Sequence, residues 1–525
     1  MSTNQAAASS TSPTATWRPD DRWLLGIVLA VINFWLFAQT LLNVIPGISD
    51  DLGMSTTIAN LAVSVTSLMS GCFIVVFGGL ADRLGREKVM NVGIWLSIVG
   101  SALIVLPFEG TAASATMLSG RIVQGLSAAC IMPSTMALVK TYYEGKERQQ
   151  ALSYWSIGSW GGSGFCSLFG GLMATSALGW RSIFYISIAL SFLALYLVKD
   201  TPVSKASTAA APGMATTGTG AAAASGDRRG FDWSGLITFV VAMLAINIYI
   251  SQGPRIGWLS ATGLALVAVF VVTILLFFKV ETSRDETFMD LGLFANLTFS
   301  GATLSNFLLN GAAGTLIVSL GLVQRAAGFT SLQSGLLTLG YLIAILATIR
   351  VGEKFLQRFG PRRPMLWGSM ITASGILLTS ATFVLIEQYV VLAFIGFTLF
   401  GVGLGFYATP STDAALSNVP DAQAGSASGI YKMASSLGAA FGVAISAAIF
   451  TAGQNIDPAL IPVESIFMGR QENIALRFGG ALALLFNVFM CLVALISIMV
   501  TVPRERPRDE QAKQPEVPAT PMIGA

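Results

Sequence analysis

The charged side chains that could carry protons or ions are few, and they lie in or beside apolar stretches. Arg121 and Lys432 stand inside long apolar runs, whereas Asp50, Asp51 and Asp413 stand at the ends of such runs. A carboxylate beside a like charge or in an apolar environment has a raised pKa, so it can bind and release a proton near neutral pH. Asp50 and Asp51 meet the first condition, although two solvated helix caps would explain the pair equally well. These five residues are our candidates for proton coupling.

The two basic residues each have two possible roles. Arg121 lies about six residues, or roughly 9 Å, inside its apolar run, and Lys432 lies about seven residues inside its own. A cation at that depth is costly unless it is paired, hydrated or able to extend to the lipid headgroups. The residues alone leave both a cavity position and a headgroup position open.

A second charged cluster places Asp82, Arg83, Arg86, Glu87 and Lys88 within seven positions between two apolar runs. Preceding glycines permit close helix approach, and a glycine within the cluster permits a tight turn. An acidic side chain at the helix end can accept hydrogen bonds from an arginine or a helix N-terminus. This segment is predicted to be a conformational-switch loop formed by Gly78, Asp82, Arg83, Gly85, Arg86 and Lys88.

The composition places the chain in a membrane. Only 11% of the 525 residues are charged and 54% are hydrophobic, whereas about 25% of the residues of a soluble protein are charged. The net charge of +3 gives no indication of nucleic-acid binding. There is no histidine, and the four cysteines are scattered, so we expect no metal site and no cofactor. The phosphate-binding loop of nucleotide hydrolases is also missing from the sequence.

Fourteen apolar segments are long enough to cross a bilayer as helices of about 20 residues. If the N-terminus is cytoplasmic, 23 of the 30 Lys and Arg residues lie in cytoplasmic segments and five in outer loops. This asymmetry follows the positive-inside rule and places both termini in the cytoplasm. The predicted spans lie near 23–46, 57–80, 89–107, 115–138, 151–174, 181–198, 233–252, 258–280, 298–322, 331–351, 363–385, 389–412, 425–450 and 474–500.

A segment rich in Ala, Thr, Gly and Ser, residues 201–231, separates six spans from eight and is predicted to be a flexible linker. A loop after the tenth span, with Arg358, Gly360 and Arg362, resembles the first charged loop, which indicates a duplicated six-span unit. The expected organisation is an N-terminal tail (1–22), a six-helix bundle (23–200), a cytoplasmic linker (201–232), two additional membrane helices (233–281), a second six-helix bundle (282–502) and a C-terminal tail (503–525).

Aromatic and amide side chains within the spans could line a binding cavity for varied amphipathic molecules. The alternative is that such residues pack against lipid or neighbouring helices. We expect about half of the candidates to line the cavity. The candidates are Asn33, Phe34, Trp35, Phe37, Gln39, Asn43, Trp155, Trp160, Asn306, Asn310, Tyr407 and Tyr431.

The charged loop "GGLADRLGREK" (78–88) resembles the signature loop of the major facilitator superfamily. The stretch "SGRIVQGLSAAC" (119–130) resembles the fourth-span motif of that superfamily, with Arg121 as its membrane arginine. Fourteen spans with two extra central helices resemble the drug:proton antiporter subfamily. Longer stretches, including "YATPSTDAALSN" (407–418) and "GIYKMASSLGAAFGVA" (429–444), are similar to the Nor-type quinolone exporters.

The resemblance implies a proton-driven exporter of amphipathic drugs such as fluoroquinolones, which spans the bacterial cytoplasmic membrane and functions as a monomer. It also favours the cavity position for Arg121. Two departures concern proton coupling: Cys166 and Ser167 replace the usual Gly-Pro of the fifth-span motif, and Ala38 stands where relatives carry Asp. The alternatives are a transporter of one specific metabolite and, less favoured because no catalytic centre is recognisable, a membrane-embedded enzyme.

Overall fold

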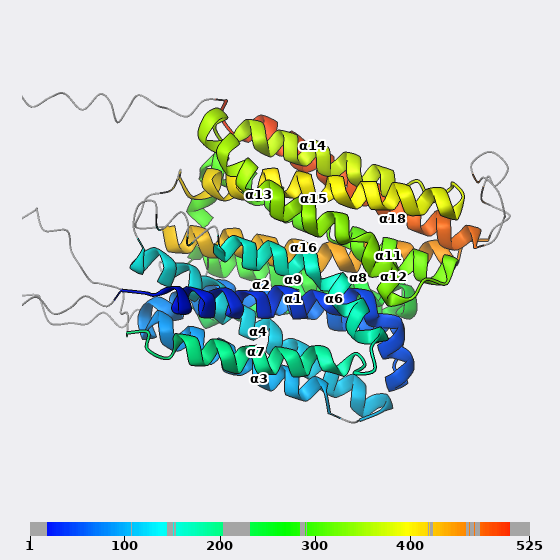
Figure 1. The fold of residues 1–525 in the computed structure, drawn as a ribbon, viewed down its shortest axis with the longest axis horizontal. Helices are drawn as coiled ribbons and strands as arrows, with labels where there is room; N and C mark the ends of the chain where they lie inside the picture. Colours follow the sequence, from blue (N-terminus) through cyan, green and yellow to red (C-terminus); the bar gives the residue numbers. More distant parts are fainter. Residues whose placement is uncertain are drawn as a thin grey trace, which may run out of the picture.

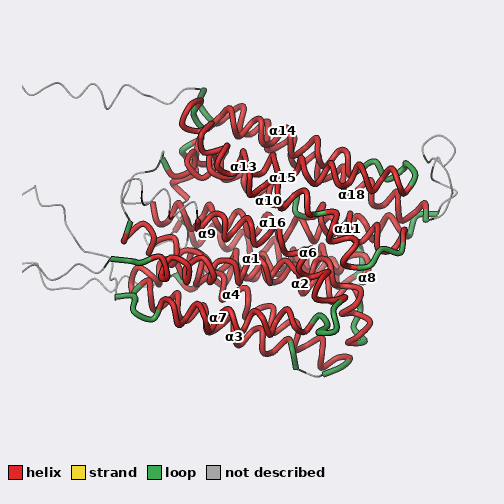
Figure 2. The backbone as a smooth tube through the Cα atoms, in the orientation of Figure 1, coloured by secondary structure: helices red, strands yellow, loops and turns green. Residues whose placement is uncertain are grey.

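The computed structural model is all α-helical in the part of the chain that it describes. Eleven helices among these residues are long and apolar enough to cross a membrane, which confirms the expected polytopic all-α class; the count of fourteen spans stays a prediction. The helices run side by side along a common direction (Figure 1, Figure 2). The described residues are 18–106, 108–143, 147, 151, 154–202, 232–283, 289, 291–417, 419, 424–457, 461, 467 and 473–504.

The first and last described segments lie at the same end of the helices, which we call the near end; the opposite end is the far end (Figure 1). The expected linker and both expected tails fall mostly outside the described residues, so the predicted domain boundaries stay predictions.

The helices of the first bundle carry their own start and stop signals. The side chain of Asp20 accepts a hydrogen bond from the Trp23 backbone at the start of the first helix, and Gly53, with φ of 60°, ends it. Ser55 caps the second helix in the same way. The bundle comprises α1 (Asp21–Leu52), α2 (Thr56–Leu84), α3 (Arg86–Ile104), α4 (Gly110–Tyr142), the π-helical turn η1 (Ile157–Gly161), α6 (Gly162–Thr175) and α7 (Arg181–Val198).

The second bundle contains two interrupted spans that periodicity does not predict. The ninth predicted span breaks between Gly311 and Gly314, where a β-carbon at Gly314 would lie only 2.6 Å from the carbonyl oxygen of Gly442. The tenth breaks at Thr338. The elements are η2 (Leu291–Ala295), α10 (Leu297–Gly311), α11 (Gly314–Ala327), α12 (Ser331–Leu337), α13 (Leu339–Phe359), α14 (Arg362–Thr379), α15 (Ile386–Leu416), α16 (Ala424–Gln454) and α18 (Ile474–Thr501).

The two additional helices, α8 (Trp233–Ile256) and α9 (Ala261–Ser283), are central in the sequence but peripheral in space. α8 packs against both α2 and α16, which belong to different bundles. Ser64 of α2 donates a hydrogen bond to Asn247 of α8 at 3.4 Å. α9 packs against α8 and is otherwise almost fully exposed, with 11% of its most apolar window buried. The pair therefore covers one of the two seams between the bundles.

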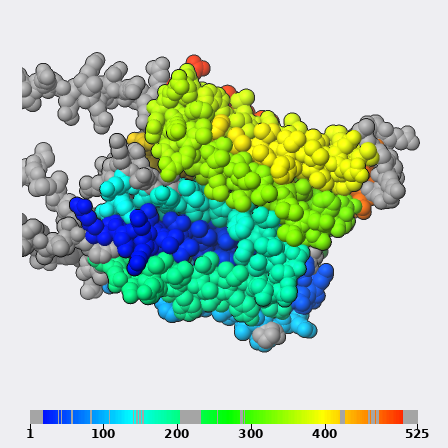
Figure 3. All heavy atoms as spheres, in the orientation of Figure 1, coloured from blue at the N-terminus to red at the C-terminus, as the bar shows by residue number. Residues whose placement is uncertain are grey.

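The bundles meet along two seams. On one seam α2 packs against α16, and on the other α6 and η1 pack against α12 and α13. α1 also reaches α11 and α12. The space-filling view shows the α6 region in direct contact with the second bundle towards the far end (Figure 3). These contacts position the polar groups described next.

Candidate functional site

A hydrogen-bonded cluster joins the two bundles in their far-end halves, and Asn43 of α1 is its centre. Its amide nitrogen donates to the backbone oxygens of Ser167 in α6, at 2.6 Å, and Ser331 in α12, at 2.8 Å. Its amide oxygen accepts from Gln324 of α11 at 2.8 Å and from Ser334 of α12 at 2.9 Å. Asn43 is fully buried, and all four hydrogen-bonding positions of its amide are used. We call this cluster the far-end seal.

Glycines bring the backbones of α6 and α12 into contact beside the same seal. A β-carbon at Gly171 would lie 2.7 Å from the carbonyl carbon of Ser331 and 2.8 Å from Cα of Leu332. A β-carbon at Gly335 would lie 2.7 Å from the carbonyl oxygen of Ser167. Because real β-carbons do not approach other atoms so closely, the closed far end requires glycine at both positions.

We expect Asn43→Ala to weaken the far-end seal. The change removes the four hydrogen bonds of the Asn43 amide to α6, α11 and α12, at a net cost of about 1–3 kcal/mol. Hydrogen–deuterium exchange of the α12 backbone should therefore become roughly ten-fold faster. The control is Asn33→Ala, because Asn33 is equally buried but bonds only within the first bundle. Equal acceleration in both variants would contradict this role of Asn43.

A second polar cluster lies within the second bundle and gathers four predicted cavity residues. Asn306 of α10 donates to the backbone oxygen of Tyr431 at 2.9 Å, and Asn310 donates to the Asn306 side chain at 2.9 Å. Further hydroxyl contacts of 2.7–2.8 Å link α10, α15 and α16. They join Ser305 to Tyr407, Tyr407 to Ser411, and Ser411 to Tyr431.

A third polar cluster crosses the first bundle and ends at Arg121, whose side chain is fully buried. Arg121 donates from Nε to the backbone oxygen of Ala62 in α2, at 3.0 Å, and from Nη1 to Gln124, at 2.8 Å. Gln124 donates to Ser101, at 3.0 Å, and Ser101 lies 3.1 Å from Ser187. The buried guanidinium is thus held by hydrogen bonds, and its chain of partners leads towards α7.

Asn33 lies at the other end of this third cluster. It accepts a hydrogen bond from Ser187 at 2.8 Å and donates to Ser97 at 2.8 Å and to Ser191. Its amide therefore bonds to α3 and α7 of its own bundle, and its place in a drug-binding cavity stays a prediction. Phe37 likewise packs edge-on against Phe169 with ring centroids 5.8 Å apart.

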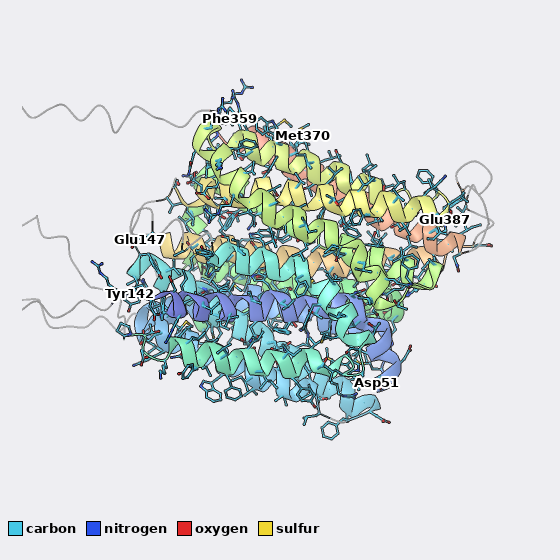
Figure 4. All side chains as sticks on the ribbon, in the orientation of Figure 1. Asp51, Tyr142, Glu147, Phe359, Met370 and Glu387 are labelled. Atoms are coloured by element: carbon cyan, nitrogen blue, oxygen red, sulfur yellow. The ribbon has the colours of Figure 1, made fainter. Side chains whose placement is uncertain are left out.

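The predicted carboxylate candidates lie at helix ends. Asp51 pairs with Arg181 at 2.8 Å at the far end (Figure 4) and also accepts a hydrogen bond from the Trp180 indole at 2.9 Å. Asp50 beside it is exposed. Asp413 is half-buried in the last turn of α15 and accepts from Ser417 at 3.2 Å. These placements connect Asp51 to the start of α7 rather than to the bundle interface.

Both predicted loops turn on a glycine at the near end. Gly85 separates α2 from α3 with φ of 114°, and Gly360 separates α13 from α14 with φ of 72°. Arg86 donates to Thr141 near the end of α4, and Arg362 donates to the Met499 carbonyl of α18 at 2.6 Å. Each loop therefore holds a neighbouring helix through an arginine.

The other residues of the two predicted loops contribute less to holding the neighbouring helices. Lys88 is exposed, and the Arg358 guanidinium lies 5.1 Å from the ring centroid of Phe359. Gly78 has ordinary van der Waals room beside Pro133 of α4, so this packing does not require a glycine there. The side chains of Asp82 and Arg83 lie outside the described residues.

Gly85→Ala should destabilise the protein. An L-residue at this backbone conformation costs about 1–3 kcal/mol, and the new β-carbon would lie 2.7 Å from Oε1 of Glu87. We expect the Tm in detergent to fall by a few degrees. Gly79→Ala is the control, because Gly79 lies within α2 and a β-carbon there meets nothing within 4 Å. An unchanged Tm for Gly85→Ala would show that the turn is not constrained.

The remaining aromatic candidates are placed around α1 and the start of the fifth span. Trp155 is buried, and its indole donates to Thr135 of α4 at 3.0 Å. Trp160 is half-buried in η1, and Phe34 stacks edge-on with Trp35 at 5.1 Å. The Trp35 indole nitrogen is buried and has no hydrogen-bond partner among the described residues. The side chain of Gln39 lies outside the described part of the chain.

Sequence reasoning missed the partners that complete these clusters. No sequence motif marks Gln324, Ser331 and Ser334, and only their contact with Asn43 across the bundles gives them a role.

A cavity of about 450 Å³ lies at the far end of the second bundle and was not predicted from the sequence. None of the predicted cavity residues lines it. It is lined by Leu322, Ala326, Thr382, Val384, Leu385, Ile386, Glu387, Tyr389, Asn473 and Arg477.

Two helical bundles that meet along a polar, buried interface are a common plan of membrane transporters. The sequence profile of the Major Facilitator Superfamily matches residues 24–303 and 299–524. The chain therefore belongs to this superfamily and is a multi-pass membrane protein, as its sequence motifs indicated.

Curated relatives are similar over nearly the whole chain. Quinolone resistance protein NorB of Staphylococcus aureus strain MRSA252 is 45% identical over 490 residues, which cover 93% of this chain and 97% of the relative. The NorB protein of strain COL is 45% identical over 486 residues, covering 93% and 96%. This confirms the resemblance to the Nor-type proteins.

Solved structures share the fold at low sequence identity. A D-xylose–proton symporter superposes with a TM-score of 0.59 at 15% identity, covering 92% of this chain and 98% of the symporter. A structure of a proton-dependent oligopeptide transporter gives 0.59 at 16% identity, covering 92% and 99%. These likenesses concern the arrangement of helices only.

Proposed function

We propose that this protein is a proton-driven exporter of amphipathic drugs, fluoroquinolones among them, in the cytoplasmic membrane of a bacterium. The relatives that carry the name quinolone resistance protein support the substrate class. The observation that carries the mechanism is the far-end seal, in which Asn43 joins α1 and α6 to α11 and α12. A transporter closed at that end takes up its substrate from the near end.

The near end faces the cytoplasm in this proposal. The positive-inside rule supports this, because 23 of the 30 basic residues lie in the segments expected to be cytoplasmic, which include the two charged loops at the near end. Export then requires that the far-end seal opens while the near end closes. The loops around Gly85 and Gly360 would control the near end, since each links two helices through a left-handed turn and an arginine. We expect the monomer to be the working unit.

Drug and proton would bind at different places. A cavity lined by aromatic rings and a few polar groups suits the binding of varied amphipathic molecules. The indole nitrogen of Trp35, which has no hydrogen-bond partner among the described residues, is one such polar group. Arg121, held between α2 and α4, is the proposed residue that responds to proton binding. The proposed drug-binding residues are Phe34, Trp35, Gln39, Trp155, Trp160, Asn306, Asn310, Tyr407 and Tyr431.

Purified protein in liposomes tests the proposal directly. An imposed pH gradient should drive the accumulation of both norfloxacin and a lipophilic dye, and each should compete with the other. Dissipating the gradient with a protonophore should abolish both signals. No response to the gradient would refute proton coupling, whereas saturable transport of a single compound without competition would indicate a specific metabolite transporter.

A further inference from the structure

We propose that Lys432 binds the carboxylate of aromatic, carboxylate-bearing substrates whose ring lies between the two bundles beside Trp155. This deepens the proposed function and rests on it, because it names the chemical class that the same site would prefer. A neutral or purely cationic drug would use the aromatic walls alone, whereas an aromatic acid or zwitterion would gain an ionic contact.

The ammonium of Lys432 lies at the interface of the bundles. Lys432 belongs to α16 and is half-buried roughly 12 Å from the start of that helix. Its Nζ atom is 5.0 Å from the ring centroid of Trp155 in the first bundle and 5.9 Å from that of Tyr431 in its own helix. The Trp155 ring is fixed in place, since it is buried and bonds to Thr135. A rigid aromatic surface therefore faces a cation across the seam.

In the described residues the ammonium of Lys432 makes no ion pair and no hydrogen bond. On the same face of α16, Ser435 accepts from Asn306 at 2.6 Å and Ser436 lies 3.5 Å from Ser70 of α2, whereas the hydroxyl of Ser428, one turn before Lys432, has no partner among the described residues. A primary ammonium has three donors, so among the described residues this one has donors that a bound ligand can use. Cation–π contacts offset only part of the cost of holding a charge in a membrane.

The surroundings of Lys432 define the shape of the proposed ligand. Trp155 and Tyr431 offer ring faces. The Asn306 amide donates to the Tyr431 backbone oxygen, and Asn310 lies one turn further along α10. A planar molecule with a carboxylate at one edge would match the ring faces and the ammonium of Lys432. An anion in this position is attracted by Lys432, whereas a second cation is repelled.

The test compares norfloxacin with its methyl ester, which lacks the negative charge, on purified full-length protein. Binding is followed by tryptophan fluorescence, and proton-driven uptake is measured separately in liposomes. In Lys432→Met we expect the Kd for norfloxacin to rise about ten-fold or more and the Kd for the ester to stay within about two-fold. Lys432→Arg should retain most of the preference for the acid. Lys199→Met is the matched control, because Lys199 lies 4.7 Å from the Tyr196 ring but is exposed.

The two readouts separate the two proposals. Loss of the acid–ester preference in Lys432→Met, with the Lys199→Met protein unchanged, supports the binding role. Equal weakening of acid and ester, or no weakening of either, overturns it, even if the wild-type protein transports drugs. If the wild-type protein binds norfloxacin with the expected preference but ignores a pH gradient, the export proposal fails while the carboxylate site stands.

Discussion

Replacement of Arg121 by alanine should lower proton-driven transport at least about 100-fold. The guanidinium is fully buried, and its hydrogen bonds include those to Ala62 and to Gln124. Bonds from a charged donor contribute roughly 1.5–3 kcal/mol each, so the loss of two corresponds to a factor of this order. Arg121→Lys should recover only part of the activity, because one ammonium does not reproduce the two directions in which the guanidinium donates. Initial uptake rates in liposomes under a fixed pH gradient provide the measurement.

In these variants, a loss of proton coupling can be distinguished from a loss of folding. Drug binding in the absence of a gradient should persist in Arg121→Lys, which shows that the protein is folded. Arg181→Ala serves as the control arginine, because Arg181 forms a surface ion pair with Asp51 whose side chain is 47% exposed, and such pairs contribute little. Transport by Arg121→Ala at the wild-type rate would remove Arg121 from the mechanism.

Gly171→Val should hold the far end open. The side chain must displace α12, since even a β-carbon would lie 2.7 Å from the Ser331 carbonyl carbon. Overpacking of this kind costs about 1–3 kcal/mol, which shifts a two-state equilibrium roughly ten- to 100-fold towards the state in which the bundles part. Transport should fall about ten-fold or more, because the cycle requires both states.

Spin labels at the far end report the change directly. Asp50 and Glu387 are exposed and belong to different bundles, and Figure 4 places the neighbouring Asp51 and Glu387 itself towards the same end. The four native cysteines are buried, so cysteines introduced at positions 50 and 387 can be labelled. Double electron–electron resonance should show a longer distance in Gly171→Val than in the parent protein. Gly79→Val is the control, and an unchanged distribution in Gly171→Val would refute the seal.

The sequence predicts those parts of the fold that depend on local chemistry. Apolar length places the membrane helices, and the glycine in each charged loop marks the turns at Gly85 and Gly360, because only glycine adopts such backbone angles readily. The interruptions at Gly311 and in η1 escape prediction, since no proline or charged residue stands beside either one. The break at Gly311 depends on how closely α16 approaches, which is a tertiary property.

The candidate site is less predictable, because amide side chains look alike until their partners are known. Asn33 and Asn43 lie ten positions apart on the same helix and were predicted to line one cavity. Asn33 bonds within its bundle, whereas Asn43 bonds across to α11 and α12. The residues that decide between these roles lie more than 60 positions away in the chain, so neither spacing nor residue type distinguishes them.

The position of the α8–α9 hairpin has a consequence for hydrophobic compounds that arrive from within the bilayer. Because α8 contacts both α2 and α16, it obstructs lateral passage through that gap, and α9 adds a second row of side chains outside it. If the near end faces the cytoplasm, the seam where η1 packs against α13 is the other side from which a compound dissolved in the inner leaflet would enter. Selection among lipid-soluble compounds would begin there, at the surface formed by Gly161 and Leu346.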